Sequence, residues 1–183
     1  MKSLIKSILP LVMLALSFNA KSDVNIRISP FALFSGTYNL SADFPIAEAW
    51  TLGPTASFMK RETEGFDVSG YAYGIRGNYY FGGKVFEDSW YFGPSLTYTH
   101  VEVERDYGGT TGEVEGRANG IALTNLFGYQ WFRKSFNFGI GIGPRYASLS
   151  EIKVKNPQNN VSETYDGSSG FGLDGEITVG WKF

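Results

Sequence analysis

The sequence predicts an all-β fold, specifically an eight-stranded antiparallel up-and-down transmembrane β-barrel. Beyond residue 23, apolar residues recur at every second position in eight runs of about ten residues, the positions between them are mostly small and polar, and the links alternate in length. Period-two alternation indicates strands with one apolar face. About ten residues is the length of a strand that crosses a bilayer at a tilt.

Each run in chain order has one apolar face and one polar face. In the first run, for example, Val24, Ile26 and Ile28 alternate with residues such as Arg27 and Ser29. The eight runs are Val24–Phe34, Tyr38–Ile46, Trp50–Phe58, Tyr71–Phe81, Trp90–Tyr98, Ile121–Trp131, Phe136–Tyr146 and Phe171–Phe183. We expect one strand from each run, because no helical periodicity of useful length follows the first 22 residues.

The alternation does not by itself tell which face of the barrel is apolar, because a lipocalin-like soluble barrel alternates with its apolar set inside. Here the polar positions carry mostly Gly, Ser, Thr and Asn, as Gly139, Gly141 and Gly143 illustrate, which suits a narrow interior. The links 47–49, 82–89 and 133–135 are short, whereas 61–69, 106–117 and 150–170 are longer, and the link near Ser35 is a short exception. Outer-membrane barrels have short periplasmic turns and long outer loops. These features predict an apolar exterior and the bacterial outer membrane.

All four tryptophans lie at the same side of the predicted barrel. Trp50 and Trp90 open runs that lead away from the short links, and Trp131 and Trp181 close runs that return to them. Each belongs to the apolar face of its run. Because indole rings favour the membrane interface, we expect an aromatic girdle at the periplasmic side.

The composition excludes several classes of function. The chain has 183 residues, no cysteine and one histidine, which excludes a disulfide scaffold, thiolate or multi-histidine metal sites and a cysteine nucleophile. The net charge of −2 offers no basic surface for nucleic acid. We therefore expect no cofactor, no metal site and no nucleic-acid partner.

Residues 1–22 have the features of a secretory signal peptide. Lys2 and Lys6 precede a short apolar stretch, the small residues Ala20 and Ser22 allow cleavage after Ser22, and cleavage after Ala20 is an alternative. The alternative is an uncleaved anchor helix. The predicted organisation is a signal peptide at 1–22 and an outer-membrane barrel at 23–183.

The closing run carries a resemblance to a known group. Ile177, Val179, Trp181 and the terminal Phe183 alternate as in the C-terminal assembly signal of the small eight-stranded Gram-negative outer-membrane barrels, the OmpA/OmpX-type group and its relatives. The segments 50–54, 90–94 and 128–132 resemble small barrels of unknown function. The resemblance implies recognition of the chain by the barrel-insertion machinery, contact with outer-membrane lipid and lipopolysaccharide, and a monomeric barrel.

The polar faces of the runs carry seven charged residues that alternation directs into the lumen. They are Arg27, Asp43, Arg76, Arg145, Asp174, Glu176 and Lys182. An unpaired buried charge is costly, so we expect an ion-pair network that fills the lumen. The alternative is a charged, ion-selective pore, although eight strands leave little free bore.

The histidine suggests one enzymatic alternative. Some small outer-membrane barrels modify lipid A with a histidine, a serine and an acid, and here His100 lies two residues before Glu102. No serine stands at the expected neighbouring position. We expect a non-enzymatic protein with a structural or surface-interaction role through its outer loops. The alternatives are a narrow channel for small or hydrophobic solutes and a lipid A-modifying enzyme.

Overall fold

The computed structural model describes residues 23–30, 36–63, 66–105, 114–150, 152–156 and 161–183. The predicted signal peptide at 1–22 and the end of the first predicted run, at 31–35, lie outside the described residues. No helix among the described residues is long and apolar enough to span a membrane.

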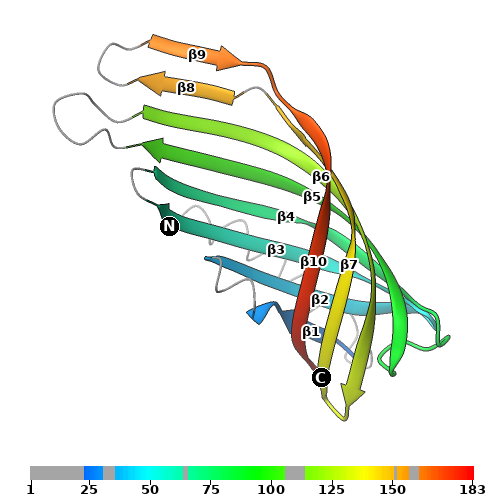
Figure 1. Cartoon of the computed structure of the whole chain (residues 1–183). Coiled ribbons are helices and arrows are strands. Elements are labelled where there is room, and N and C mark those ends of the chain that lie inside the picture. The colour runs from blue at the N-terminus through cyan, green and yellow to red at the C-terminus, as the bar shows by residue number, and fades with distance from the viewer. Residues whose placement is uncertain (1–22, 31–35, 64–65, 106–113, 151, 157–160) are drawn as a thin grey trace.

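Eight antiparallel strands form the closed wall of the barrel, which confirms the predicted fold class (Figure 1). Each strand pairs with its neighbours in the chain, and β10 closes the barrel by pairing with β1. The wall strands are β1 (Asn25–Ile28), β2 (Thr37–Ala47), β3 (Trp50–Thr63), β4 (Phe66–Tyr80), β5 (Ser89–Arg105), β6 (Val114–Arg133), β7 (Phe136–Leu149) and β10 (Ser169–Lys182).

The two ends of the barrel differ. We call the end at which β1 begins and β10 ends the base, and the opposite end the rim. At the rim, β8 (Ile152–Asn156) and β9 (Val161–Tyr165) form a hairpin that pairs with β6 and continues the wall (Figure 1). The strands β3 to β6 also run beyond the predicted runs, so that β3 and β4 are separated only by residues 64–65 rather than by a link at 61–69.

The extra strand length has a simple physical reason. Near the rim the pairing of β5 with β6 continues through Glu102 and Arg117. There the alternation of β5 changes phase, with Val101 and Val103 at inward positions and Glu102 at an outward one. The backbone hydrogen-bond ladder does not need an apolar outer face, so it persists where that face has ended. The predicted runs therefore marked only the part of each strand whose outer face is apolar.

The wall is polar inside and apolar outside, the inverse of a soluble barrel. Arg27 and Asp43 are each only 1 % exposed within the lumen. Outward-facing Ile75, Ile121 and Ile142 are more than half exposed. This arrangement agrees with the predicted direction of the apolar face and leaves the lumen as the place where polar side chains meet.

Candidate functional site: the barrel lumen

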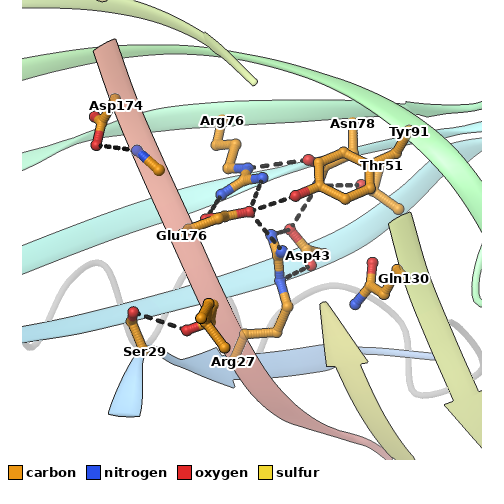
Figure 2. Close-up of polar contacts among 12 residues, drawn as sticks. Arg27, Ser29, Asp43, Thr51, Arg76, Asn78, Tyr91, Gln130, Asp174 and Glu176 are labelled. Atoms are coloured by element: carbon orange, nitrogen blue, oxygen red, sulfur yellow. Dashed lines mark hydrogen bonds and ion pairs between the residues drawn. The ribbon is translucent and has the colours of Figure 1, made fainter. Parts of the chain in front are cut away.

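Four charged side chains meet inside the barrel (Figure 2). The Arg27 guanidinium holds Asp43, with Nε 2.8 Å from Oδ2 and Nη2 3.0 Å from Oδ1. Arg76 forms a bidentate ion pair with Glu176 through both terminal nitrogens, and its Nη2 lies 2.6 Å from Oε1. Arg27 Nη1 lies 3.7 Å from the same Glu176 oxygen and joins the two pairs. These residues come from β1, β2, β4 and β10, so the network crosses the lumen.

Neutral side chains complete the hydrogen bonds of this charge network on the side of the base. Asn78 accepts a bond from Arg76 Nε at 2.9 Å and donates to Asp43 at 3.1 Å and to Thr51 at 3.2 Å. Tyr91 reaches from β5 and donates its hydroxyl to Glu176 Oε1 at 2.7 Å (Figure 2). Buried charges need such additional partners, because two opposite charges rarely recover their desolvation cost alone.

Nearer the base, a chain of amide groups continues the network. Tyr80 donates to Gln130 at 2.9 Å, Gln130 donates to Asn137 at 2.8 Å, and Asn137 donates to Asn25 at 2.6 Å. Asn25 in turn donates to Asp43 at 3.3 Å. Residues from β1, β2, β4, β6 and β7 are thereby linked through continuous polar contacts across the interior.

Glycines on nearby strands make room for the large side chains. A side chain at Gly141 would meet the Tyr91 hydroxyl, and one at Gly128, which is paired with Tyr91, would lie 2.7 Å from the same atom. A side chain at Gly180, which is paired with Arg27, would lie 2.7 Å from Arg27 Cγ and from Asn137. The small residues of the inward face therefore let long side chains of nearby strands lie over them and extend into the lumen.

The link 81–88 closes the base with apolar side chains. Phe86 is only 6 % exposed and packs against Phe132 with ring centroids 5.8 Å apart, in a cluster with Tyr80, Tyr91 and Leu126. Phe86 adopts a φ of 61°, an unusual conformation for a residue with a side chain. This backbone conformation directs the Phe86 ring toward Phe132 and the rest of the cluster. The lumen is thus filled by an apolar cluster and a charge network in succession.

Asp88 anchors the end of that link outside the wall. Its carboxylate accepts a hydrogen bond from the Phe132 backbone N–H at 2.7 Å and contacts Arg133 at 2.8 Å. The Phe132 N–H and the Arg133 guanidinium lower the pKa of Asp88 below its ordinary value. Asp88 therefore joins the link 81–88 to the end of β6.

Three of the seven predicted lumen charges lie apart from the four that meet. Arg145 and Asp174 face each other nearer the rim, 3.8 Å apart and 41 % and 37 % exposed. Lys182 lies at the base and contacts Asp23 at 3.5 Å. The prediction of one network with seven members is therefore too broad, because these side chains sit at different heights along the lumen.

The predicted girdle residues lie on the outside of the base. Trp90 stacks on Phe127 with centroids 5.2 Å apart, and Trp131 packs on Tyr129 and Phe138. Trp50 packs on Tyr79, and Trp181 is paired opposite Phe136 at the end of β10. Ile177 and Val179 of the closing segment lie on the same face of β10 as Trp181. Phe183 follows the end of β10, and its N–H donates to Val24 O at 2.9 Å.

His100 lies near the rim, away from the charge network. Its Nδ1 is 2.6 Å from Asn119 Oδ1 and its Nε2 is 3.2 Å from Glu102 Oε1, while Arg117 contacts the same Glu102 oxygen at 3.2 Å. Tyr71 stacks on the imidazole ring with centroids 5.0 Å apart. Both ring nitrogens thus have acceptor partners. No group of three His, Asp or Glu side chains within the described residues could hold a metal ion.

Several lumen residues were not predicted as part of the site. They are Asn25, Thr51, Asn78, Tyr80, Tyr91, Gln130 and Asn137, which are all almost fully buried. Their positions in the alternation could have identified them, because each occupies an inward-facing position of its strand. A search restricted to charged residues passes over the amides and phenols that satisfy those charges.

Comparison with protein families places the chain in a family whose activity is undetermined. A family model described as "Protein of unknown function (DUF3575)" matches residues 7–181. The chain belongs to this family. The match covers almost the whole length, so the lumen network and the closing segment as far as Trp181 lie within the family's extent. No curated protein matches the sequence.

Two solved structures resemble the fold. The N-terminal β-barrel domain of Pseudomonas aeruginosa OprF superimposes with a TM-score of 0.51 and 13 % identity, covering 88 % of this chain and 97 % of that domain. The translocator domain of the autotransporter NalP from Neisseria meningitidis has a TM-score of 0.48 and 14 % identity, covering 95 % of this chain and 67 % of that one. The OprF comparison agrees with an outer-membrane-type β-barrel fold.

Proposed function

We propose that this DUF3575 protein is an integral outer-membrane barrel with a blocked lumen, and that it acts structurally or through surface contacts at its rim. The observation that carries the proposal is the closure of the lumen by two successive layers. The apolar cluster around Phe86 fills the base, and the Arg27–Asp43–Arg76–Glu176 network lies above it. An eight-stranded barrel is only just wide enough for its own side chains, so these layers leave little path for a solute.

The outer surface supports placement in the membrane. Apolar side chains such as Leu40, Leu123 and Ile140 face outward and are about half exposed, and the four tryptophans lie near the base. Such a surface is stable against lipid and unfavourable in water. We infer that outer-membrane lipid contacts this belt, that lipopolysaccharide lies against the wall near the rim, and that the barrel is a monomer of the OmpA/OmpX type.

Conductance in a planar bilayer tests the blocked lumen. The refolded protein should give no steady current, because both layers must open for ions to pass. Arg76→Ala removes one member of the network, and Arg145→Ala changes a residue outside it. Steady wild-type current that changes with Arg76→Ala would refute the structural role and favour the narrow channel.

The closing segment supports a proposal about assembly. Trp181 and Phe183 are exposed on the outer side of β10, where another protein can reach them before the barrel closes. We infer that the insertion machinery reads Ile177, Val179, Trp181 and Phe183. Deletion of Phe183 should reduce the amount of folded barrel in the outer membrane, measured by its heat-modifiable mobility on gels. The same deletion should leave refolding into detergent largely intact.

The contacts of His100 argue against a lipid A-modifying enzyme. A general base needs a free nitrogen beside the hydroxyl it activates, whereas both nitrogens of this ring are engaged by Asn119 and Glu102. We therefore propose that His100 is not catalytic. The test is mass spectrometry of lipid A from cells that express the wild type or His100→Ala. A modification present with the wild type and lost with the variant would overturn this proposal.

A further inference from the structure

The part of the lumen between the charge network and the rim is lined by hydroxyl groups. Short hydroxylated side chains point inward from β2, β3, β5 and β6, and they line one cavity together with Arg145 and Asp174. These side chains are Ser41, Thr55, Ser57, Ser95, Thr97 and Thr124. We call this region the hydroxyl chamber. Because serine and threonine are short, they cannot reach the opposite wall as Tyr91 and Arg76 do nearer the base.

The chamber contains a polar atom that the fold leaves without a partner. The Nε atom of Arg145 is buried and has no hydrogen-bond partner among the described residues. Arg145 lines the cavity beside Asp174. A buried polar group without a partner is costly and usually binds water or a ligand.

The charges of the lumen balance. Arg27, Arg76 and Arg145 stand against Asp43, Asp174 and Glu176, and each arginine contacts at least one of these acids. The pair in the chamber, Arg145 with Asp174, is loose at 3.8 Å and half exposed, so both groups remain accessible to a solute. A balanced lumen favours neither an anion nor a cation.

We propose that the hydroxyl chamber binds a neutral, polyhydroxylated molecule the size of one or two sugar rings. Hydroxyl groups both donate and accept hydrogen bonds, which suits another set of hydroxyl groups. Ser95 and Thr124 lie directly opposite each other in the pairing of β5 with β6 and present two such groups side by side. Arg145 adds donors and Asp174 adds acceptors. The large apolar side chains Leu96 of β5 and Leu123 of β6 face outward, away from the chamber.

The chamber is part of a larger cavity with room for such a ligand. The whole cavity, which also reaches Arg27 and Thr178 on the side of the base, measures about 1180 Å³. Small-molecule sites generally have volumes of roughly 300–1,000 Å³, so a part of this cavity suffices. The charge network forms its floor, with Arg76 and Glu176 among the lining residues. This inference goes beyond the proposed structural role, since a barrel that conducts no ions can bind a solute from the rim.

The experiment uses the refolded barrel in an amine-oxide detergent, because alkyl-glycoside detergents present sugar headgroups that compete. Threonine methyl groups are labelled with ¹³C, and glucose and trehalose are titrated while methyl shifts are recorded by NMR. Glycine betaine and phosphate serve as zwitterionic and anionic probes. The expected result is a saturable shift of the Thr97 and Thr124 methyl signals with glucose, with trehalose or with both. Betaine and phosphate should give no saturable shift in the same concentration range.

Two variants decide where the sugar binds. The double variant Thr97→Val/Thr124→Val keeps the shape of the chamber and removes two hydroxyls. It should weaken sugar binding at least tenfold, measured by the shift of the Thr55 methyl signal, which remains in the variant. Thr164→Val makes the same chemical change on β9, where Thr164 is exposed and outside the chamber, and should leave the affinity within twofold. Intact folding of each variant is checked by its methyl spectrum and heat-modifiable mobility.

Three outcomes would overturn the inference. The first is the absence of any saturable shift with either sugar up to tens of millimolar. The second is equal affinity in the wild type and the Thr97→Val/Thr124→Val variant, which would place binding elsewhere. The third is saturable binding of betaine or phosphate at lower concentrations than either sugar, which would assign a charged ligand. A conducting barrel would refute the blocked lumen and leave these binding results unchanged.

Discussion

The two halves of the lumen use polar side chains in opposite ways. Near the base, Arg27, Arg76 and Tyr91 are long enough to cross the interior and find partners on other strands. Toward the rim, residues such as Ser95 and Thr124 are too short to do so. The polarity of the inward face is similar throughout, so side-chain length decides which half is filled and which is open.

The same comparison appears within a single strand. Glu176 and Asp174 lie two residues apart on the inward face of β10, and each contacts an arginine. Glu176 accepts from Arg76 and Tyr91 and is 14 % exposed, whereas Asp174 has a loose contact and is 37 % exposed. Burial and additional hydrogen bonds, rather than the number of ion pairs, therefore determine which of the two carboxylates contributes more to the free energy of unfolding.

The largest expected effect comes from Glu176→Gln, which leaves Arg76 buried without its anionic partner. Removing one partner of a buried ion pair costs about 3–5 kcal/mol. Asp174→Asn is the matched control and should cost at most about 1 kcal/mol, as for other half-exposed pairs. Urea unfolding of the barrel in lipid vesicles measures both. Equal losses would contradict the distinction between the two halves of the lumen.

The apolar cluster at the base gives the next effect. Phe86→Ala should destabilise the barrel by about 3 kcal/mol, because truncation of a buried phenylalanine leaves a cavity. Phe81 belongs to the same link but is 56 % exposed on the outside, so Phe81→Ala should cost clearly less. The free energy of unfolding of both variants is measured in vesicles. A larger loss for Phe81→Ala would mean that the link does not close the base.

Gly141→Ala should have an intermediate effect, because its added methyl group meets the Tyr91 hydroxyl and displaces it from Glu176. Overpacking of this kind costs about 1–3 kcal/mol. Gly172→Ala, nearer the rim, is the control, since a side chain there has no neighbour within 4 Å. Its stability should change by less than about 0.5 kcal/mol. Comparable losses at both glycines would show that Tyr91 does not depend on this space.

The smallest effect concerns pH and the anchor at Asp88. Because the folded-state pKa of Asp88 is lowered, its contribution stabilises the fold above the ordinary carboxyl pKa of about 3.9 and is lost as the pH falls through the lower, folded-state value. The difference in urea midpoint between wild type and Asp88→Asn should therefore be present at pH 7 and vanish in acid. A difference that grows in acid would contradict the sign of the pKa shift.

Much of the barrel was predictable from local patterns. Alternation identified the apolar faces of the eight strands and directed Arg27, Asp43, Arg76 and Glu176 inward, because successive side chains of a strand point to opposite sides. It did not locate the strand ends near the rim, where β5 and β6 continue by backbone pairing although the outward face of β5 is no longer apolar. Alternation also could not identify Phe86 as a buried residue, because Phe86 lies in the link 81–88, where side-chain direction does not follow the strand period of two.

The sequence by itself determined the β class, the number of wall strands and the inward or outward direction of most side chains, since these follow from a period of two along each strand. Only the tertiary structure decided which inward residues meet. Glu176 joins Arg76 from a strand 100 residues away, and Lys182 remains at the base with Asp23. Contact across the lumen depends on the relative height of strands that are distant in the chain, and this height is set by the register of the closed barrel.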